Sequence, residues 1–477
     1  MAEDARSAAV APALNGVPLG RAPLAVLSAL EEGGLEAWVV GGWVRDALLG
    51  RPGHDVDVCC SGSWEESAAA LRAAGMGVVE SGTRFGGITA LVRGERIEVT
   101  AYRLDGFYAD GRHPSTIVRA ASVEDDLARR DFTVNAMAWH PERGLLDLYD
   151  GQGDLARRQI RAVGEPRRRF EEDALRMLRA VRFSCRLGFE IEPATAQALA
   201  ACAPLLDAVA RERVGQELDE ILLSTRGGEA LLRAPELMCA AVPELAACRG
   251  FDQRSRYHVF DVYGHTAQVL KEAGALERER RAAGAEAEAF RPLAWAALLH
   301  DISKPETFTM DTRGHGHFHG HPERGAERAR AIMRRLALPR AVIDEACLLI
   351  RHHDRPLCAS RSDMLGILNA LSGEGRDALR LADELFDLKR ADTLGKAPFC
   401  FSYVGDIEEM RRLAHELAAA GGAYSLKTLA LAGGDLVRAG VEPGPRVGEM
   451  LERALKAQMA GEVENRTDVL LGWLGLA

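Results

Sequence analysis

The stretch Val39-Val-Gly-Gly-Trp-Val-Arg-Asp46, followed by His54-Asp-Val-Asp-Val58, decides how the first part of this chain folds. The glycine pair ends a strand, a short helical run follows, and a second strand carries Asp55 and Asp57. Because strand side chains alternate between faces, the two carboxylates project to the same side, where one or two divalent cations can bind. The glycines leave backbone amides open to close approach by a triphosphate. This order predicts a metal-dependent site for nucleotidyl transfer.

Each half of this pattern has a common alternative explanation. An isolated Asp-x-Asp is usually a solvated turn, and an isolated Gly-Gly is usually a hinge. The order of Gly41, Gly42, Arg45 and Asp46 before the Asp-x-Asp strand is far more restrictive than either part alone. The combined pattern therefore favours a functional site.

Length and composition indicate a protein of several units without a membrane segment. The 477 residues are 47% hydrophobic and 27% charged, and no apolar run is long enough to span a bilayer. The first 22 residues lack a basic start leading into an apolar segment, so we expect a disordered leader and not a signal peptide. The 9 cysteines include no Cys-x-x-Cys pair, which predicts reduced thiols in a cytoplasm and no zinc-thiolate site.

A local cluster of arginines contrasts with the net charge of −10. Residues 155–186 hold ten arginines (157, 158, 161, 167, 168, 169, 176, 179, 182 and 186) against four acids (165, 171, 172 and 173), a local charge of +6. Such a cluster can attract phosphate groups even in an acidic protein. The alternative is a charged helix surface held together by ion pairs.

The hydrophobic pattern changes near residue 158. Before it, short β-like runs alternate with helices, and after it long helical segments prevail, so we predict an α+β protein with a small mixed α/β head and a mostly helical remainder. We expect strands at Ala37–Val40, Val56–Cys59, Gly87–Val92, Arg96–Ala101 and Leu145–Asp147, and helices at Trp64–Ala74 and Leu127–Met137.

Two further pieces follow the opening motif. The strand Arg96-Ile-Glu-Val-Thr-Ala-Tyr-Arg103 presents Glu98, which is either a third carboxylate beside the metal or an ordinary solvated strand residue. Residues 105–121 then form a polar loop long enough to move over a substrate.

Two later segments carry groups that suit a nucleotide. Asp126-Leu-Ala-Arg-Arg-Asp-Phe-Thr-Val-Asn-Ala-Met137 places Arg129, Arg130 and Asp131 beside Asn135, a set suited to ribose and phosphate contacts.

The segment Glu172-Asp-Ala-Leu-Arg176-Met-Leu-Arg179 is predicted to be helical. On a helix Asp173 and Arg176 share a face, where an acceptor and a forked donor can bond the edge of a base without a template. The alternative is a surface ion pair between Glu172 and Arg176.

In this order the motifs resemble the class II CCA-adding tRNA nucleotidyltransferases, which share their catalytic head with bacterial poly(A) polymerases. Arg211-Glu-Arg-Val-Gly-Gln-Glu-Leu218 is similar to the family's next motif, a helix in the neck. The resemblance implies that Asp55 and Asp57 hold Mg²⁺, and Glu98 is the third predicted catalytic residue. It implies that Asp173 and Arg176 read CTP and then ATP in one pocket. The nucleotide contacts it implies are Gly41, Gly42, Arg45, Asp46, Arg129, Arg130, Asp131, Asn135, Asp173, Arg176 and Arg179.

The same resemblance leaves rival activities open: a poly(A) polymerase, or an enzyme that adds only part of the CCA end. The loop with Asp110-Gly-Arg112 argues against an enzyme that adds only CC, because the family's CC-adders lack part of it. The segment Leu429–Gly444, with Gly448 and Asn465-Arg466, is similar to the family's tail domain, which implies contacts with tRNA through shape and phosphates.

A second pattern lies further along the chain, where 9 of the 13 histidines fall between residues 258 and 353. Histidine is a common metal ligand, and carboxylates can bridge two ions. The order resembles the helical HD phosphohydrolase superfamily over about residues 255–395. The resemblance implies one metal held by His265, His300, Asp301 and Asp392, and a second held with His321 and His352. It leaves His315, His317 and His319 to the loop.

These observations predict five segments: a leader (1–22), a nucleotidyltransferase head (23–165), a helical neck (166–245), an HD domain (246–400) and a helical tRNA-binding tail (401–477). We expect addition of C, C and A to tRNA from CTP and ATP, with Mg²⁺ in the head. The HD domain is expected to hold a divalent metal and to hydrolyse phosphoesters, such as 2′,3′-cyclic or 3′-phosphate RNA ends. The alternatives are a metal-dependent phosphohydrolase whose head only binds nucleotides, and a non-catalytic RNA-binding protein.

Overall fold

The structure is a computed structural model that describes residues 12–476 except 54, 81, 84–85, 105–117, 225, 283, 285–289 and 374. It divides into two compact units, Met1–Ala210 and Arg211–Ala477. Most of the predicted moving loop, including Asp110-Gly-Arg112, lies outside the described residues, as does His54. The five predicted segment boundaries stay predictions.

A short hairpin precedes the head. Strands β1 (Ala13–Leu14) and β2 (Val17–Pro18) pair antiparallel. Asn15 and Gly16 between them have φ angles of 50° and 79°, as the tight Asn-Gly hairpin turn requires. The prediction of a disordered leader to residue 22 is therefore wrong for these residues, because the Asn-Gly signal was overlooked.

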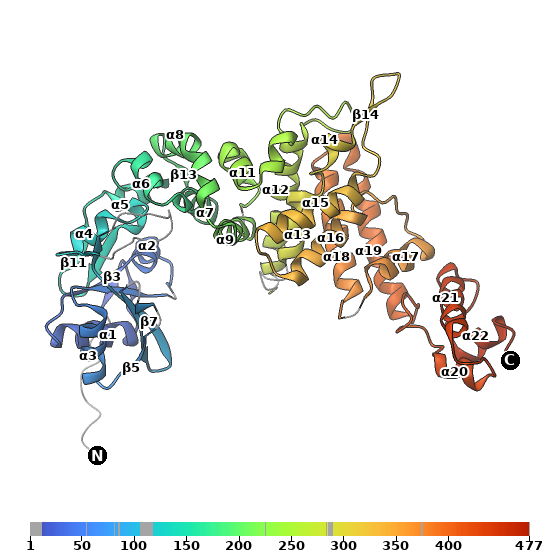
Figure 1. Ribbon diagram of the computed structural model, residues 1–477, viewed down its shortest axis with the longest axis horizontal. Helices are drawn as coiled ribbons and strands as arrows, with labels where there is room; N and C mark the ends of the chain where they lie inside the picture. The colour runs from blue at the N-terminus through green and yellow to red at the C-terminus, as the bar shows by residue number, and fades with distance from the viewer. Residues whose placement is uncertain are drawn as a thin grey trace, which may run out of the picture. The chain divides into compact units, whose positions relative to one another are not determined.

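A seven-stranded mixed sheet forms the core of the head (Figure 1), in the order β11-β10-β3-β4-β7-β6-β5. Neighbours pair antiparallel except β4 and β7, which are parallel. The five predicted strands agree with the structure to within one residue, whereas β5 and β10 were not predicted. The strands are β3 (Ala37–Val40), β4 (Asp57–Cys60), β5 (Gly77–Val79), β6 (Gly87–Val92), β7 (Glu95–Ala101), β10 (Met137–His140) and β11 (Gly144–Asp147).

The predicted helix Leu127–Met137 is wrong. Helix α4 (Val123–Ala128) ends before it, a single 3-10 turn η2 (Thr133–Asn135) follows, and β10 begins at Met137. β10 is buried at every position and pairs with both β3 and β11. Two rows of ladder hydrogen bonds therefore outweigh the local helical pattern.

The two faces of the sheet carry different helices. Helices α1 (Arg21–Glu32) and α3 (Trp64–Ala73) pack on the sheet and on each other (Figure 1). The Cys60 thiol faces α3, because its sulfur lies 3.1 Å from the Ser67 hydroxyl. Cys59, one residue earlier, packs on the opposite face against α4. Asp57 projects to the same face as Cys59, since strand side chains alternate.

Helices follow the sheet within the first unit: α5 (Gly151–Arg157), α6 (Pro166–Glu172), α7 (Leu175–Leu187) and α8 (Pro193–Cys202). The predicted helix carrying both Asp173 and Arg176 is in fact two helices, because Asp173 is extended with φ −147° and ψ 103°. Its carboxylate accepts a hydrogen bond from the Leu175 backbone amide at 3.0 Å, so Asp173 caps the start of α7.

The second unit is mostly helical, as predicted. Its long helices α12 (Val262–Ala282), α13 (Arg291–Leu299), α16 (Arg340–His352) and α18 (Ala378–Leu394) pack together, with α15 (His321–Arg335) against α16. Every residue of α13 except Arg291 is buried. A small hairpin of β14 (Thr309–Met310) and β15 (Gly316–His317) precedes α15 in the chain (Figure 1).

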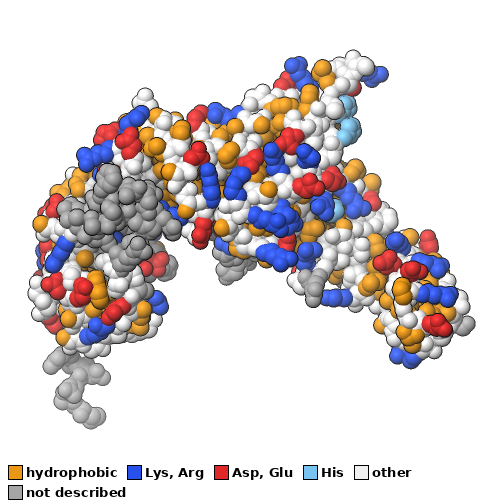
Figure 2. All heavy atoms as spheres, viewed as in Figure 1, with side chains coloured by type: hydrophobic (Ala, Val, Ile, Leu, Met, Phe, Trp, Pro, Cys, Tyr) orange, Lys and Arg blue, Asp and Glu red, His pale blue; other side chains and the backbone are white. Residues whose placement is uncertain are grey.

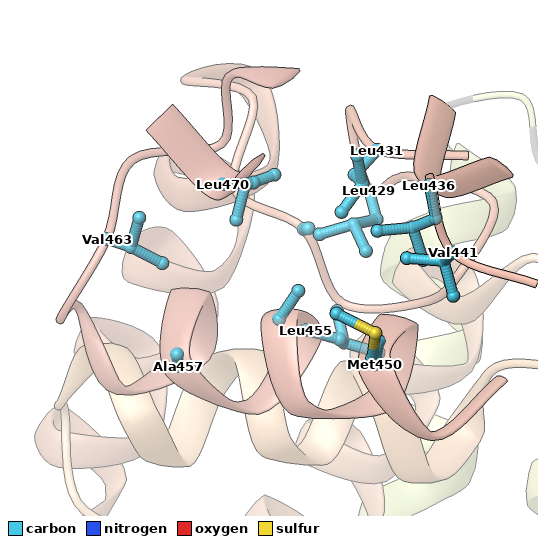
Figure 3. Packing of buried hydrophobic residues seen from close by; sticks show 11 residues of the cluster. Leu429, Leu431, Leu436, Val441, Met450, Leu455, Ala457, Val463 and Leu470 are labelled. Atoms are coloured by element: carbon cyan, nitrogen blue, oxygen red, sulfur yellow. The ribbon is translucent and has the colours of Figure 1, made fainter. Parts of the chain in front are cut away.

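The C-terminal segment has a small core of its own. Helix α19 (Tyr403–Ala419) packs on α17 (Arg361–Leu371) and α18. After it, α20 (Gly433–Arg438), α21 (Pro445–Ala460) and α22 (Thr467–Trp473) enclose a cluster of apolar side chains. Figure 3 shows Leu436, Met450, Leu455 and Leu470 turned toward one another in this cluster.

The cysteines of this chain form no disulfide bonds among the residues that the structure describes. All nine cysteines are unpaired, and six of them are buried. Within the part of the chain that the structure describes, no helix is both long enough and apolar enough to cross a membrane.

Candidate active site and metal centre

The first candidate site is a group of carboxylates at the start of β4. The parallel pairing of β4 with β7 places Asp57 directly beside Glu98. Asp55 is exposed and lies just before the strand. Burial raises the pKa of Asp57 to about 6, and the negative charges of Glu98 and Asp55 add to this effect against the opposing charge of Arg130. Oxygen ligands that repel one another are stabilised by a hard divalent cation, so this group fits Mg²⁺.

Gly41 allows the backbone to pass close to these carboxylates. It has φ 74° and ψ −128°, a conformation that residues with a side chain rarely adopt. A β-carbon at this position would lie 3.2 Å from the Arg130 guanidinium and 3.8 Å from the Asp57 carboxylate. Gly42 begins helix α2 (Gly42–Leu48) immediately afterwards. The predicted close-approach role of the glycine pair therefore has a steric basis.

A chain of charged hydrogen bonds connects α2, η2 and α7. The Arg45 guanidinium donates to both carboxylate oxygens of Asp46 at 2.9 and 3.0 Å and to the Asn135 carbonyl at 2.7 Å. The Asn135 amide donates to Asp131 at 3.2 Å, and Arg179 donates two bonds to Asp131 at 2.8 and 2.6 Å. Residues up to 134 positions apart are thus joined in one hydrogen-bonded network.

Asp131 shows how strongly this network is charged. Burial alone would raise its pKa, but Arg179 and the Asn135 amide hold the pKa below its usual value. Asp131 therefore stays ionised and keeps the Arg179 guanidinium in place.

Arg129 and Arg130 have a partner that sequence reasoning missed. Both guanidinium groups donate to the carboxylate of Asp126, at 2.7 and 3.0 Å for their closest contacts. Asp126 is fully buried. The signal was present in the sequence, because Asp126 lies three and four residues before the two arginines and α4 places that spacing on one face.

Asp126→Asn is expected to lower the free energy of unfolding by about 3 kcal/mol at pH 7, because it leaves two arginines facing a buried neutral group. The paired arginines hold the pKa of Asp126 below its ordinary value despite burial. The wild-type contribution is therefore present above the unfolded pKa and is lost as the pH falls through the lower folded pKa. Urea unfolding from pH 3 to pH 7 measures both effects. A variant as stable as wild type at pH 7 would contradict this assignment.

Arg176 is held by its neighbours in α6 and α4. Its guanidinium donates to the Glu172 carboxylate at 2.9 Å, the Arg169 carbonyl at 3.2 Å and the Arg129 carbonyl at 3.1 Å. Glu172 and Arg176 thus form an ion pair, but Arg176 is buried, so the pair is not the solvated surface pair raised as the alternative. Asp173 is half-buried at the break between the two helices.

Ion pairs also account for most of the arginine cluster. At least seven of the ten arginines pair with a carboxylate, namely Arg157, Arg161, Arg167, Arg168, Arg169, Arg176 and Arg179. Arg167 and Arg168 make only loose pairs of 3.7 and 3.5 Å, with side chains 60% and 81% exposed. Such loose, exposed pairs leave both guanidinium groups accessible to an external phosphate.

The second candidate site is a buried histidine cluster in the second unit. Two sets of three residues each bring their ligand atoms within 4.8 Å of one another. The first set is His265, His300 and Asp301, and the second is Asp301, His321 and His353. All five side chains are buried, and Asp301 belongs to both sets. A shared carboxylate between two imidazole pairs has the ligand chemistry of a two-metal centre.

The imidazole rings are oriented as metal ligands. In each ring Nδ1 faces a backbone carbonyl at 2.7–3.1 Å: Gly395 for His265, Ala297 for His300, Phe318 for His321 and Ile350 for His353. A carbonyl only accepts, so Nδ1 carries the proton and Nε2 presents a lone pair. Yet Nε2 of His265 lies 3.4 Å from Nε2 of His300, and the same atoms of His321 and His353 lie 3.3 Å apart. Facing lone pairs repel unless a cation lies between them.

Asp301 and Asp392 complete the centre. Neither oxygen of Asp301 has a well-oriented hydrogen-bond donor among the described residues, although the Lys304 ammonium lies 2.7 Å from one of them. Burial would raise the pKa of Asp301, but neighbouring positive charge, including that of the Lys304 ammonium, holds it well below its ordinary value. Asp392 lies 3.0 Å from Nε2 of His265. A buried ionised carboxylate with unfilled acceptor sites fits a metal.

The prediction that His352 is a ligand is wrong by one position. His353 joins the cluster, whereas His352 lines a separate surface cavity with Pro322 and Glu323. Successive residues at the end of a helix point about 100° apart, so only one of the pair can face inward. The buried face of α16, which includes Ile343, Ala346 and Ile350, continues to position 353 and could have identified it from the sequence.

The loop histidines stay outside the cluster, as expected. His315 and His317 each lie 3.4 Å from the Asp311 carboxylate, and the ring of His319 stacks on that of His317. Figure 2 shows histidine side chains at the surface beside the β14–β15 hairpin.

Family profiles match four consecutive parts of the chain. The Poly A polymerase head domain matches residues 37–161, and the probable RNA and SrmB-binding site of polymerase A matches residues 188–248. The HD domain matches residues 262–396, and the putative tRNA nucleotidyltransferase domain 2 matches residues 406–474.

Similar proteins extend along nearly the whole chain. The CCA-adding enzyme of Leuconostoc mesenteroides subsp. mesenteroides is 30% identical over 450 residues, which cover 93% of each chain. That of Geobacillus stearothermophilus is 31% identical over 94% of this chain and 95% of its own.

Solved structures of CCA-adding enzymes have a similar fold. The Bacillus stearothermophilus CCA-adding enzyme in complex with CTP has a TM-score of 0.67 and 27% identity, covering 95% of this chain and 96% of that one. The Thermotoga maritima CCA-adding enzyme complexed with tRNA shares the fold, with a TM-score of 0.58, 21% identity and coverage of 95% and 94%.

Proposed function

This chain belongs to the CCA-adding enzymes, and from that premise we propose that Asp55, Asp57 and Glu98 hold Mg²⁺ for the transfer of nucleotides to tRNA. The protein is a tRNA nucleotidyltransferase that adds C, C and A to the 3′ end from CTP and ATP. The observation that carries the proposal is the pairing of Asp57 with Glu98 across parallel strands, with the pKa of Asp57 raised to about 6. A raised pKa in such a cluster is typical of a functional site.

The residues around this cluster have complementary roles in the proposal. Bound Mg²⁺ supplies charge neutralisation at the α-phosphate and promotes ionisation of the attacking 3′-hydroxyl. Gly41 and Gly42 let the triphosphate approach the backbone, and Arg130 offers positive charge beside Asp57. Arg45, fixed by Asp46 and Asn135, orients the sugar and phosphates. Ionised Asp57 is required for metal binding, so the affinity for Mg²⁺ falls as the pH drops below about 6.

The choice of base is assigned in this proposal to Asp173 and Arg176. Asp173 lies at the break between α6 and α7, so its carboxylate is carried by an extended residue and not by a helix. Three hydrogen bonds orient the buried Arg176 fork, and such a preformed donor set discriminates bases better than a mobile one.

Arg176→Ala is expected to reduce the preference for CTP and ATP over UTP and GTP by about 10- to 100-fold, the effect of losing a bidentate contact worth about 1–3 kcal/mol. Incorporation of each nucleotide by itself into tRNA substrates ending before each C and before A measures this preference. Arg186→Ala, an exposed arginine of the same helix, is the matched control. An unchanged preference in Arg176→Ala would show that Arg176 has only its structural contacts.

For the HD centre we propose a pair of divalent metals held by His265, His300, Asp301, His321, His353 and Asp392. Bound metal supplies an activated water for phosphoester hydrolysis. The substrates proposed are RNA ends with a 2′,3′-cyclic or 3′-phosphate, whose removal restores the hydroxyl that the head extends. Hydrolysis of a tRNA fragment ending in a cyclic phosphate, measured after loading with Mn²⁺, Co²⁺ or Ni²⁺, tests this activity. Absence of cleavage with every metal would refute it.

The cytoplasm is the proposed location, supported by nine unpaired cysteines.

A further inference from the structure

The buried metal centre opens into two neighbouring cavities of the second unit. One has a volume of about 520 Å³ and the other about 320 Å³. Both are lined by His258, His353, Asp354, Asp392 and Lys396. Because His353 and Asp392 belong to the centre, a ligand in either cavity can reach the metal ligands.

The larger cavity has an aromatic wall that the hydrolytic centre itself does not need. It is lined by Tyr257, Phe399 and Tyr403. Tyr257 and Phe399 are 46% and 57% exposed, and their ring centres lie 5.7 Å apart. Large aromatic rings left exposed beside a cavity are typical of a binding surface.

The two rings are held in place by their surroundings. The Arg256 guanidinium lies 5.0 Å from the Tyr257 ring centre and 5.9 Å from that of Phe399. The backbone carbonyl of Tyr257 accepts a hydrogen bond from the Ala397 amide at 2.8 Å, which joins the two segments that carry the rings. The aromatic pair is therefore preformed and needs little reorganisation on binding.

Lys389 and Lys396 line the same cavity as the aromatic pair, together with the carboxylates Asp354 and Asp392. Lys396 donates to Asp392 at 2.6 Å, and Lys389 donates to the carbonyls of His353 and Arg355 at 2.7 and 2.8 Å. The exposed Arg355 also lines the cavity. A cavity that offers both aromatic rings and cations suits a ligand with a planar base and an anionic phosphate, such as a nucleoside phosphate.

We propose that Tyr257 and Phe399 form a platform on which the base of a nucleoside phosphoester stacks while its phosphate reaches the metal centre. This proposal rests on the proposed phosphohydrolase function and names the part of the substrate that the centre recognises. Stacking requires only a π-face, so the platform accepts every base and binds purines more tightly than pyrimidines because they offer more area.

Two substrates that differ only in the nucleoside test the platform: adenosine 2′,3′-cyclic phosphate and glycerol 1,2-cyclic phosphate. The double variant Tyr257→Leu/Phe399→Leu is expected to raise KM about 10- to 100-fold for the adenosine ester, as the loss of base stacking predicts. For the glycerol ester the change in KM should stay below about threefold, because this ester has no base that could stack on the two rings. Phe401→Leu is the control, because Phe401 is 40% exposed but does not line the cavity.

An equal loss on both esters, or the same loss in Phe401→Leu, would overturn the platform. If the wild-type chain cleaves neither ester, the phosphohydrolase proposal fails, and equilibrium binding of the adenosine ester to the metal-loaded chain then tests the platform separately. A dissociation constant about 10- to 100-fold weaker in the double variant supports it. Equal dissociation constants would refute it.

Discussion

Asp57→Asn is expected to lower kcat/KM for CTP and ATP addition by about 10³-fold or more and to make the protein more stable. The loss follows because the metal ligand beside Glu98 disappears, and a catalytic metal contributes several kcal/mol to transition-state stabilisation. Single-turnover incorporation into tRNA lacking its 3′ end measures the first effect. Urea unfolding at pH 7 in chelator measures the second.

The gain in stability follows from the pKa of Asp57. Its pKa is 3.8 for the unperturbed group and about 6 in the fold, so the folded state binds more protons in that interval. The stability linked to this group is therefore fully present below the unfolded pKa and is lost as the pH rises through the folded pKa. Asparagine removes that loss. Since solvent screens a half-buried carboxylate, we expect a gain of about 1–2 kcal/mol at pH 7.

Glu95→Gln provides the matched control for this variant. Glu95 is exposed on the same strand as Glu98 but three residues away, so its side chain lies on the opposite face. It should leave activity and stability unchanged. If Asp57→Asn kept a tenth of the activity, or if it destabilised the fold, Asp57 would be a structural residue and the proposed metal site would be wrong.

Asp301→Asn is expected to remove bound metal from both positions of the HD centre while leaving nucleotide addition by the head intact. Asp301 is the one residue common to both ligand sets, and an amide is a much weaker ligand than a carboxylate. Metal analysis after dialysis should fall from about two ions per chain to near zero. The metal-dependent rise in stability, about 2.7 kcal/mol at a hundredfold excess over the dissociation constant, should vanish as well.

His353→Gln and His352→Gln form a matched pair for the same centre. Only the first should lower the metal content, because only the side chain of His353 points to Asp301. Unchanged metal in Asp301→Asn would refute the centre. Equal losses in the two histidine variants would refute the choice of His353 over His352.

The sequence predicted most reliably those parts of the fold that local patterns control. Short runs of apolar and β-branched residues marked β3, β4, β6, β7 and β11, and of these β7 alternates buried and more exposed positions. β10 was missed, since its strand conformation depends on pairing with β3, which is distant in sequence, as well as with its hairpin partner β11. The break at Asp173 was missed because the residues around it have ordinary helix propensity, and its carboxylate caps α7.

The same distinction holds for the sites. The residue types and their order were enough to point to Asp55, Asp57 and the histidine cluster, since chemistry requires those groups. Which of His352 and His353 faces inward depends on the phase of α16, and the role of Asp126 depends on burial that spacing alone does not reveal. Tertiary packing therefore decides which histidine faces the centre and which carboxylate pairs with the two arginines, and the motifs alone do not.

The central claim is that this chain adds C, C and A to tRNA by itself. It is tested most directly by incubating tRNA that lacks its last three nucleotides with the protein, CTP, ATP and Mg²⁺, and then sequencing the 3′ ends. The account predicts products ending in CCA that stop after the third nucleotide, with no products from Asp57→Asn. Runs of A on the same tRNA, or no extension by the wild-type protein, would contradict it.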